Sequence, residues 1–154
     1  MWQRFMLNIF FDVDYTLLSM DGTLRPGTRE VFQRLVDDGH RLYIWSGVGM
    51  RTADVQRHEL EGFVSGVFQK PLENFEEGLE TFGVTVRPDF VIDDYPEIVG
   101  NFGGVVARPY YFKNFEDNEM ERIYKIINEY LETGHSDEVG FRLGNNGSTE
   151  QTPG

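Results

Sequence analysis

Four segments of the sequence end in polar side chains that are suited to binding phosphate or a metal ion. Each follows a short apolar run, and the side chains are, in chain order, Asp12 and Asp14, Ser46 and Gly47, Lys70, and Asp93 and Asp94. If the apolar runs are parallel strands, these residues lie at the carboxyl ends of one sheet, where open α/β folds bind their ligands. We therefore expect them to converge on one crevice.

Four carboxylates in one crevice repel each other by about 1 to 4 kcal/mol per close pair, depending on the local dielectric. Lys70 alone cannot neutralise them, whereas a divalent cation can. The chain has no Cys and only three His, and His40, His58 and His135 show no ligand spacing. A metal site must therefore be built from oxygen, which suits Mg²⁺.

A hydroxyl and an ammonium beside such a cation add what a phosphoryl group requires, namely donors for its oxygens and positive charge. Ser46 and Lys70 supply these two groups. An ionised carboxylate within reach of phosphorus is also a competent nucleophile, as aspartyl-phosphate intermediates show. The side chains therefore predict metal-dependent phosphoryl chemistry.

The elements that must position these residues alternate between strand-length apolar runs and segments with helical spacing, as a parallel sheet with crossover helices requires. The predicted strands are 5–13, 41–45, 63–68, 89–93 and 104–107, and the predicted helices are 28–38, 50–60, 72–82, 96–102 and 120–131. This pattern predicts an α/β fold with a Rossmann-like, doubly wound parallel sheet of five strands. Residues 17–24 predict a small β-hairpin flap after the first strand.

A chain of 154 residues, of which 40% are hydrophobic, has the size of one domain with its own core. We place this domain at residues 1–133. From residue 134 onward the sequence is polar and Gly-rich without periodicity. Residues 134–154 are therefore predicted to form a flexible C-terminal tail.

The four sets of residues also resemble the ordered motifs of a known family. Asp12-Val-Asp14-Tyr-Thr16-Leu, Ser46-Gly47, Lys70-Pro71 and Val-Ile-Asp93-Asp94 are similar to the four motifs of the haloacid dehalogenase-like (HAD) superfamily of phosphohydrolases. The resemblance spans residues 5–110, and each motif lies at a predicted strand end or just after it.

The resemblance implies a role for each matching residue. Asp12 is the expected nucleophile, and Asp14 is the expected general acid and base. Mg²⁺ is expected to bind the side chains of Asp12 and Asp93, the backbone carbonyl of Asp14, and Asp94. Phosphate binding is expected from Ser46, Gly47 and Lys70, while Thr16 braces the loop after the first strand.

Two features depart from the common pattern of this family. Tyr15 stands where many relatives have Gly. A cap domain, which closes the site in many relatives, does not fit into the intervals between the first three motifs, because one hairpin, two helices and two strands already fill them. The chain therefore resembles the capless subgroup, and we expect an open site whose rim includes Tyr15, Met20, Arg108 and Tyr110.

The net charge of −12 has the wrong sign for binding nucleic acid by phosphate neutralisation, so no general nucleic-acid binding is expected. The expected partner is a phosphorylated metabolite or a phosphoprotein. No signal peptide or membrane span is recognisable, which predicts a cytoplasmic protein without membrane association. Nothing in the sequence indicates an oligomeric state.

Two other functions use similar residues. A phospho-acceptor domain of the receiver type also combines an acidic pocket, Mg²⁺, Ser or Thr, and Lys, but it takes its acceptor Asp from the third strand, and the predicted strand 63–68 has none. A non-catalytic phosphate-binding regulatory module on the same fold is the second alternative. The presence of both Asp12 and Asp14 argues against it.

Overall fold

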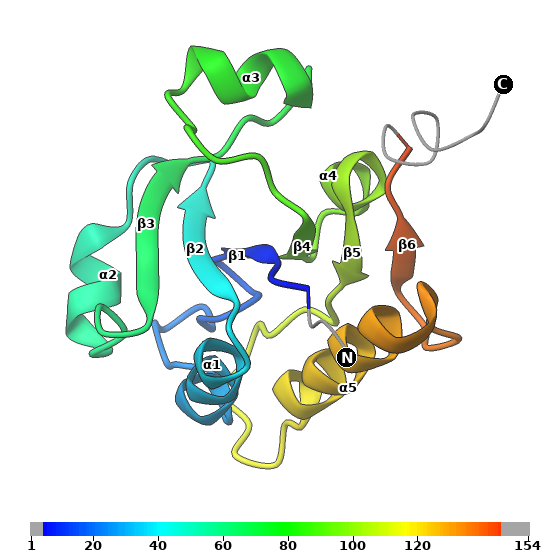
Figure 1. Ribbon diagram of the computed structural model, residues 1–154. Coiled ribbons are helices and arrows are strands. Elements are labelled where there is room, and N and C mark those ends of the chain that lie inside the picture. Colours follow the sequence, from blue (N-terminus) through cyan, green and yellow to red (C-terminus); the bar gives the residue numbers. More distant parts are fainter. Residues whose placement is uncertain (1–4, 146–154) are drawn as a thin grey trace, which may run out of the picture.

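The computed structural model describes residues 5–145, which form one six-stranded sheet with helices on both faces (Figure 1). The strands are β1 Asn8–Asp12, β2 Arg41–Ser46, β3 Val64–Gln69, β4 Phe90–Asp93, β5 Gly103–Val106 and β6 Phe141–Leu143. The helices are α1 Thr28–Asp37, α2 Thr52–Arg57, α3 Phe75–Thr81, α4 Pro96–Phe102 and α5 Glu119–Thr133.

The strand order is β3-β2-β1-β4-β5-β6, and the first five strands are parallel. The chain runs outward from β1 to β2 and β3 and then returns to place β4 on the other side of β1. This reversal makes the junction of β1 and β4 the topological switch point of a doubly wound sheet. The predicted Rossmann-like α/β fold is confirmed.

The alternation of side chains along the strands divides the core between the two faces of the sheet. In β1, Ile9 and Phe11 belong to the larger cluster, which also contains apolar residues of α1 and α5. Phe10 points to the opposite face, where it packs with Tyr43 and Trp45 and with residues of α4. Figure 1 shows α1 and α5 side by side below the sheet and α3 at the opposite end of the view.

The predicted hairpin flap lies between β1 and α1. Leu18 and Leu24 form an antiparallel bridge, and the Ser19 amide donates to the Thr23 carbonyl at 3.0 Å. Gly22 at the turn has a φ of 80°, which favours glycine. This hairpin fills the segment between β1 and α1, and α2 with its flanking loops fills the segment between β2 and β3. The absence of a cap domain stays a prediction.

The prediction of five strands was one strand short. Residues 141–143, which were expected in a flexible tail, form β6 and pair antiparallel with β5. The ordered domain therefore continues past residue 133, at least to Leu143, and Phe141 contributes to the larger core cluster. Residues 146–154 of the expected tail lie outside the described residues.

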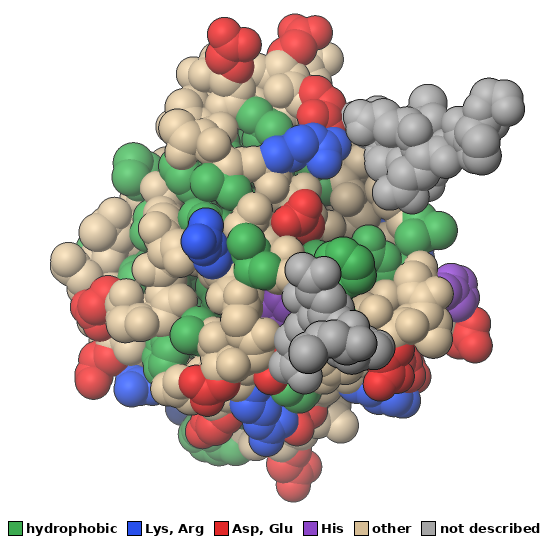
Figure 2. Space-filling view, in the orientation of Figure 1, with side chains coloured by type: hydrophobic (Ala, Val, Ile, Leu, Met, Phe, Trp, Pro, Cys, Tyr) green, Lys and Arg blue, Asp and Glu red, His purple; other side chains and the backbone are tan. Residues whose placement is uncertain are grey.

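The surface seen in Figure 2 carries acidic side chains at the top of the view, over α3, which has Glu76 and Glu77 in its first turn. Basic side chains lie singly among acidic and apolar ones on this face. Within residues 5–145, none of the helices has the length and apolar character needed to cross a membrane.

Candidate active site

The candidate site lies at the switch point of the sheet. Asp12 is the last residue of β1 and Asp93 is the last residue of β4, so two adjacent parallel strands end in carboxylates. Ser46 ends β2, and Lys70 directly follows β3. The sheet thus brings residues from four different strand ends to one edge, as the sequence predicted.

Lys70 lies between the two strand-end carboxylates. Its Nζ atom is 2.9 Å from Oδ1 of Asp12 and 2.9 Å from Oδ2 of Asp93, and all three side chains are buried. The Lys70 backbone amide donates to the Ser46 carbonyl at 2.9 Å, which holds the start of the Lys70 loop against β2. Lys70 is therefore a structural partner of both carboxylates and not a solvated surface lysine.

Both carboxylate oxygens of Asp12 have donors. Lys70 Nζ donates to Oδ1, and the hydroxyl of the fully buried Thr16 donates to Oδ2 at 3.2 Å. Thr16 lies in a tight turn in which the amides of Leu17 and Leu18 both donate to the Val13 carbonyl. The orientation of the Asp12 side chain is thus held by its own loop and by Lys70.

The electrostatics of this buried cluster are unbalanced. Burial raises the pKa of Asp12 well above its ordinary value, and the Asp93 carboxylate raises it further, although Lys70 acts in the opposite direction. Burial also raises the pKa of Asp93 against the effect of Lys70. Burial lowers the pKa of Lys70, but the attraction of Asp12 and Asp93 outweighs it and raises that pKa. Burial therefore disfavours the charged forms of Asp12 and Asp93, and Lys70 offsets this effect only in part.

The donor set fits a divalent cation. Asp12, Asp93 and Asp94 each offer one oxygen, and these oxygens lie within 4.8 Å of one another. Three carboxylates beside one ammonium leave two negative charges without a counter-ion, and a divalent ion supplies two positive ones. An all-oxygen set of carboxylates is the chemistry that Mg²⁺ prefers. The backbone carbonyl of Asp14 as a fourth ligand stays a prediction.

Asp14 lies at the edge of the site and makes an ion pair that sequence reasoning missed. Its oxygens accept from Nη1 and Nη2 of Arg51 at 2.7 and 3.1 Å, and its side chain is 44% exposed. Arg51 immediately precedes α2 and also contacts the Ser46 hydroxyl through Nη1 at 3.4 Å. The three-residue spacing of Arg51 and Asp54 indicates their mutual contact but not the contact of Arg51 with Asp14.

Ser46 and Gly47 begin the loop that follows β2. The Ser46 hydroxyl accepts from the Val48 amide at 3.3 Å. A Cβ atom on Gly47 would lie 2.6 Å from the Leu72 side chain, so glycine lets this loop pack against the loop that carries Lys70. The two expected phosphate-binding segments thus pack against each other.

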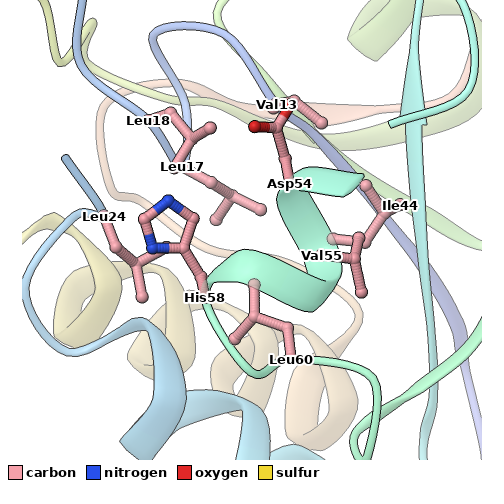
Figure 3. A pocket seen from close by; sticks show the side chains of 9 residues that line it. All are labelled: Val13, Leu17, Leu18, Leu24, Ile44, Asp54, Val55, His58 and Leu60. Atoms are coloured by element: carbon pink, nitrogen blue, oxygen red, sulfur yellow. The ribbon is translucent and has the colours of Figure 1, made fainter. Parts of the chain in front are cut away.

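A small apolar cavity behind the site shows how α2 is held against the hairpin (Figure 3). Leu17, Leu18 and Leu24 face Val55 and Leu60 across it. Its volume is about 10 Å³, room for roughly one water molecule, so it is not a substrate pocket. Asp54 of α2 also lines this cavity.

Of the four expected rim residues, Tyr15 is partly exposed and Met20 and Arg108 are exposed, and their role at a rim stays a prediction. Tyr15 has a φ of 65°, and its ring centroid is 5.1 Å from that of Tyr111. The Met20 amide donates to the Tyr111 carbonyl at 2.8 Å, and the Met20 side chain is 64% exposed. These contacts join the hairpin to the loop after β5. Arg108 follows β5 with an exposed side chain 3.4 Å from Glu119.

Tyr110 does not lie on the surface, because it is only 2% exposed and its ring packs against the Arg25 guanidinium at 5.0 Å. Its hydroxyl accepts from the Asn114 amide. The neighbouring residue Tyr111, in contrast, is 47% exposed. In a run of three aromatic residues, the sequence does not reveal which one faces the core.

Comparison with known proteins gives one family. The family model described as haloacid dehalogenase-like hydrolase matches residues 9–65. The matched segment contains Asp12, Asp14, Ser46 and Arg51 and ends before Lys70 and Asp93. No curated protein and no solved structure matches the chain.

Proposed function

We propose that this chain hydrolyses phosphomonoesters with the help of Mg²⁺, through an aspartyl-phosphate intermediate on Asp12, in keeping with the haloacid dehalogenase-like hydrolase model that matches residues 9–65. The observation that carries this proposal is the buried contact of Asp12 with Lys70 and Asp93, beside the third carboxylate Asp94. A carboxylate held in this way has a fixed orientation and lies beside positive charge, as a nucleophile for phosphorus requires.

In the first step, one carboxylate oxygen of Asp12 attacks the phosphorus atom, and the bond from phosphorus to the ester oxygen breaks. The departing oxygen takes a proton from Asp14, a partly exposed carboxyl two residues from Asp12 that takes this proton from solvent when the substrate binds. Thr16 and Lys70 keep the Asp12 side chain oriented, and such positioning supplies a large part of catalysis in phosphoryl transfer.

In the second step, Asp14, now ionised, removes a proton from a water molecule, and the water oxygen attacks phosphorus. The bond from phosphorus to Asp12 breaks, which returns both aspartates to their starting states and releases inorganic phosphate. Acid–base help of this kind is typically worth about 10²–10⁴-fold in rate. Ser46, with Gly47 beside it, and Lys70 bind the phosphoryl oxygens.

Asp12, Asp93 and Asp94 would hold the Mg²⁺ ion, which would neutralise the excess negative charge and polarise the phosphoryl oxygens. The raised pKa values of Asp12 and Asp93 support this role, because a bound cation favours the ionised carboxylates that burial disfavours.

The proposed substrate is a phosphorylated metabolite or a phosphoprotein. With a net charge of −12, the protein repels acidic macromolecules at long range, which disfavours nucleic acid. An open site must take its binding energy from the substrate itself. Weak turnover of small generic phosphate esters is therefore expected.

The experiment that tests the proposal is a screen of phosphorylated metabolites, phosphopeptides and oligonucleotides with Mg²⁺. We expect turnover that excess EDTA abolishes and that Asp12→Asn does not support. Asp37→Asn, on the exposed side of α1, is the matched control for the charge change and should keep full activity. Full activity in EDTA or in Asp12→Asn contradicts the proposal, and phosphate binding without any turnover favours the non-catalytic alternative.

A further inference from the structure

We infer that Arg51 binds the phosphoryl group of the substrate directly, as a third protein donor beside Ser46 and Lys70. This inference rests on the proposed function, because it adds a residue to the same site. It is carried by the position of the guanidinium group, which contacts both Asp14, the expected proton donor, and Ser46, an expected phosphate ligand.

One edge of the guanidinium faces the site. Nη1 of Arg51 is 2.7 Å from Oδ2 of Asp14, the expected proton donor, and 3.4 Å from the hydroxyl of Ser46, an expected phosphate ligand. The Arg51 side chain is only 18% exposed. A charged group with so little contact with water interacts more strongly with an anion than a solvated arginine does.

The other edge of the guanidinium is anchored. Nε of Arg51 donates to Oδ2 of Asp54 at 2.6 Å, and the second oxygen of Asp54 pairs with Nη1 of Arg57 at 2.8 Å. Asp54 is 16% exposed and lines the cavity shown in Figure 3. Asp54 is therefore a positioning residue that directs both Nη groups of Arg51 toward Asp14 and Ser46.

The contact with Asp14 leaves Arg51 able to bind phosphate. Each Nη group carries two hydrogens, and Asp14 uses one on each. The second hydrogen of Nη1 is directed to the Ser46 hydroxyl, and the distance from Nη1 to the hydroxyl oxygen is long, at 3.4 Å. A phosphoryl oxygen bound to Ser46 is charged and is the better acceptor, and a planar guanidinium matches phosphate geometry well.

Arg51 could also favour phosphate binding only by neutralising Asp14, because an unpaired Asp14 carboxylate would repel phosphate. Removal of Arg51 alone would then weaken phosphate binding about as much as loss of a direct contact. The two roles differ when Asp14 carries no charge. If Arg51 acts only by neutralising Asp14, its removal has no effect once Asp14 is asparagine. If Arg51 contacts phosphate, its removal still weakens binding.

The test measures binding of inorganic phosphate, the proposed product, by isothermal titration calorimetry in the presence of Mg²⁺. The proteins are the wild type, Asp14→Asn, Arg51→Ala and the double variant. Arg57→Ala is the matched control. Arg57 carries the same charge as Arg51 and also pairs with Asp54, but its side chain is 59% exposed. Circular dichroism verifies the fold of each variant.

We expect Arg51→Ala to raise the Kd for phosphate by about tenfold or more in the Asp14→Asn background, as loss of a charge-assisted hydrogen bond does. Arg57→Ala should change the Kd less than about twofold. An unchanged Kd in the Asp14→Asn background overturns the inference and leaves the proposed function standing. If the wild type neither binds phosphate nor hydrolyses any ester, the proposed function fails as well.

Discussion

Tyr15 occupies a backbone position that favours glycine. Its φ of 65° lies in the left-handed region, where a side chain typically costs about 1 kcal/mol or more. The ring contact with Tyr111 and the hydrogen bond from the Tyr110 amide to the Tyr15 carbonyl hold this conformation. Tyrosine here offsets the strain by joining the loop after β1 to the loop after β5.

Comparing Tyr15→Gly with Tyr15→Ala separates the strain from the ring contact. Both variants lose the ring, but only alanine keeps the cost of the positive φ. We expect the alanine variant to be less stable than the glycine variant by about 1 kcal/mol, measured by urea unfolding. Equal stability of the two variants would show that the backbone at this position carries no strain.

Glu119 is a buried carboxylate whose charge is well compensated. Its oxygens accept from Nε and Nη2 of Arg122 at 2.8 and 2.7 Å and from the Arg108 amide at 2.8 Å. Burial alone would raise the pKa of Glu119, but these bonds outweigh burial and lower the pKa below its ordinary value of 4.5. The folded state therefore binds this proton more weakly than the unfolded state does.

The lowered pKa makes part of the stability depend on pH. The contribution of Glu119 is present in full above its unfolded pKa and is lost as the pH falls through the folded one. We expect the wild type to exceed Glu119→Gln in free energy of unfolding at about pH 6 and this difference to shrink toward pH 3. A difference that stays constant over this range would contradict the linkage.

Single residues of the site differ in how well the sequence predicted them. Asp12, Ser46, Lys70 and Asp93 end strands or directly follow them, so the apolar runs alone indicated that they meet. Arg51 is separated from its strand by a loop, and its contact with Asp14 depends on the direction of a flexible side chain. Such a contact has no periodic signal in a sequence.

At the scale of elements, Arg25 connects the hairpin segment to the loop between β5 and α5. Arg25 is 2% exposed, and its guanidinium pairs with both oxygens of Asp117 at 2.8 and 3.0 Å and donates to the Thr16 carbonyl at 3.1 Å. Thr16 in turn donates to Asp12. A buried ion pair thus supports the turn that orients the proposed nucleophile.

Removal of one partner from this buried pair leaves the other charge without compensation. We expect Arg25→Ala to lower the free energy of unfolding by about 3 to 5 kcal/mol. The control is Arg34→Ala, which breaks the exposed pair with Glu121 and should cost less than about 1 kcal/mol. Equal losses in the two variants, measured by urea unfolding, would show that burial of the pair is irrelevant.

Element boundaries were predictable where the chain carries strong local signals. The predicted helix 96–102 coincides with α4, because Pro96 starts the helix and Gly103, with a φ of 91°, ends it. β6 was missed because it has only three residues, two of them exposed, within a polar and Gly-rich segment. It exists through its pairing with β5, a contact between distant residues that no local pattern indicates.

At the scale of the whole molecule, a divalent ion bound only by the folded protein should stabilise it. We expect Mg²⁺ to raise Tm above the value in NaCl of equal ionic strength. The two solutions screen the net charge of −12 equally, so the difference in Tm reports binding. Asp94→Asn should lose most of this rise. Asp137→Asn, which removes a fully exposed carboxylate, is the control and should keep it.

The same titration can contradict the metal site. If Mg²⁺ and NaCl raise Tm equally, general screening explains the effect. If Asp94→Asn responds to Mg²⁺ as strongly as Asp137→Asn does, Asp94 is not a ligand. Differential scanning fluorimetry over a range of Mg²⁺ concentrations measures both outcomes.

The most direct measurement of the central claim is detection of the phosphoryl group on Asp12. Asp14→Asn protein is mixed with Mg²⁺ and p-nitrophenyl phosphate, whose leaving group needs no proton, and is quenched in acid and digested. Since Asp14 no longer activates water, the intermediate should accumulate, and mass spectrometry should find the phosphoryl group on the peptide with Asp12. Release of p-nitrophenol without any phosphorylated Asp12 peptide would contradict the covalent mechanism.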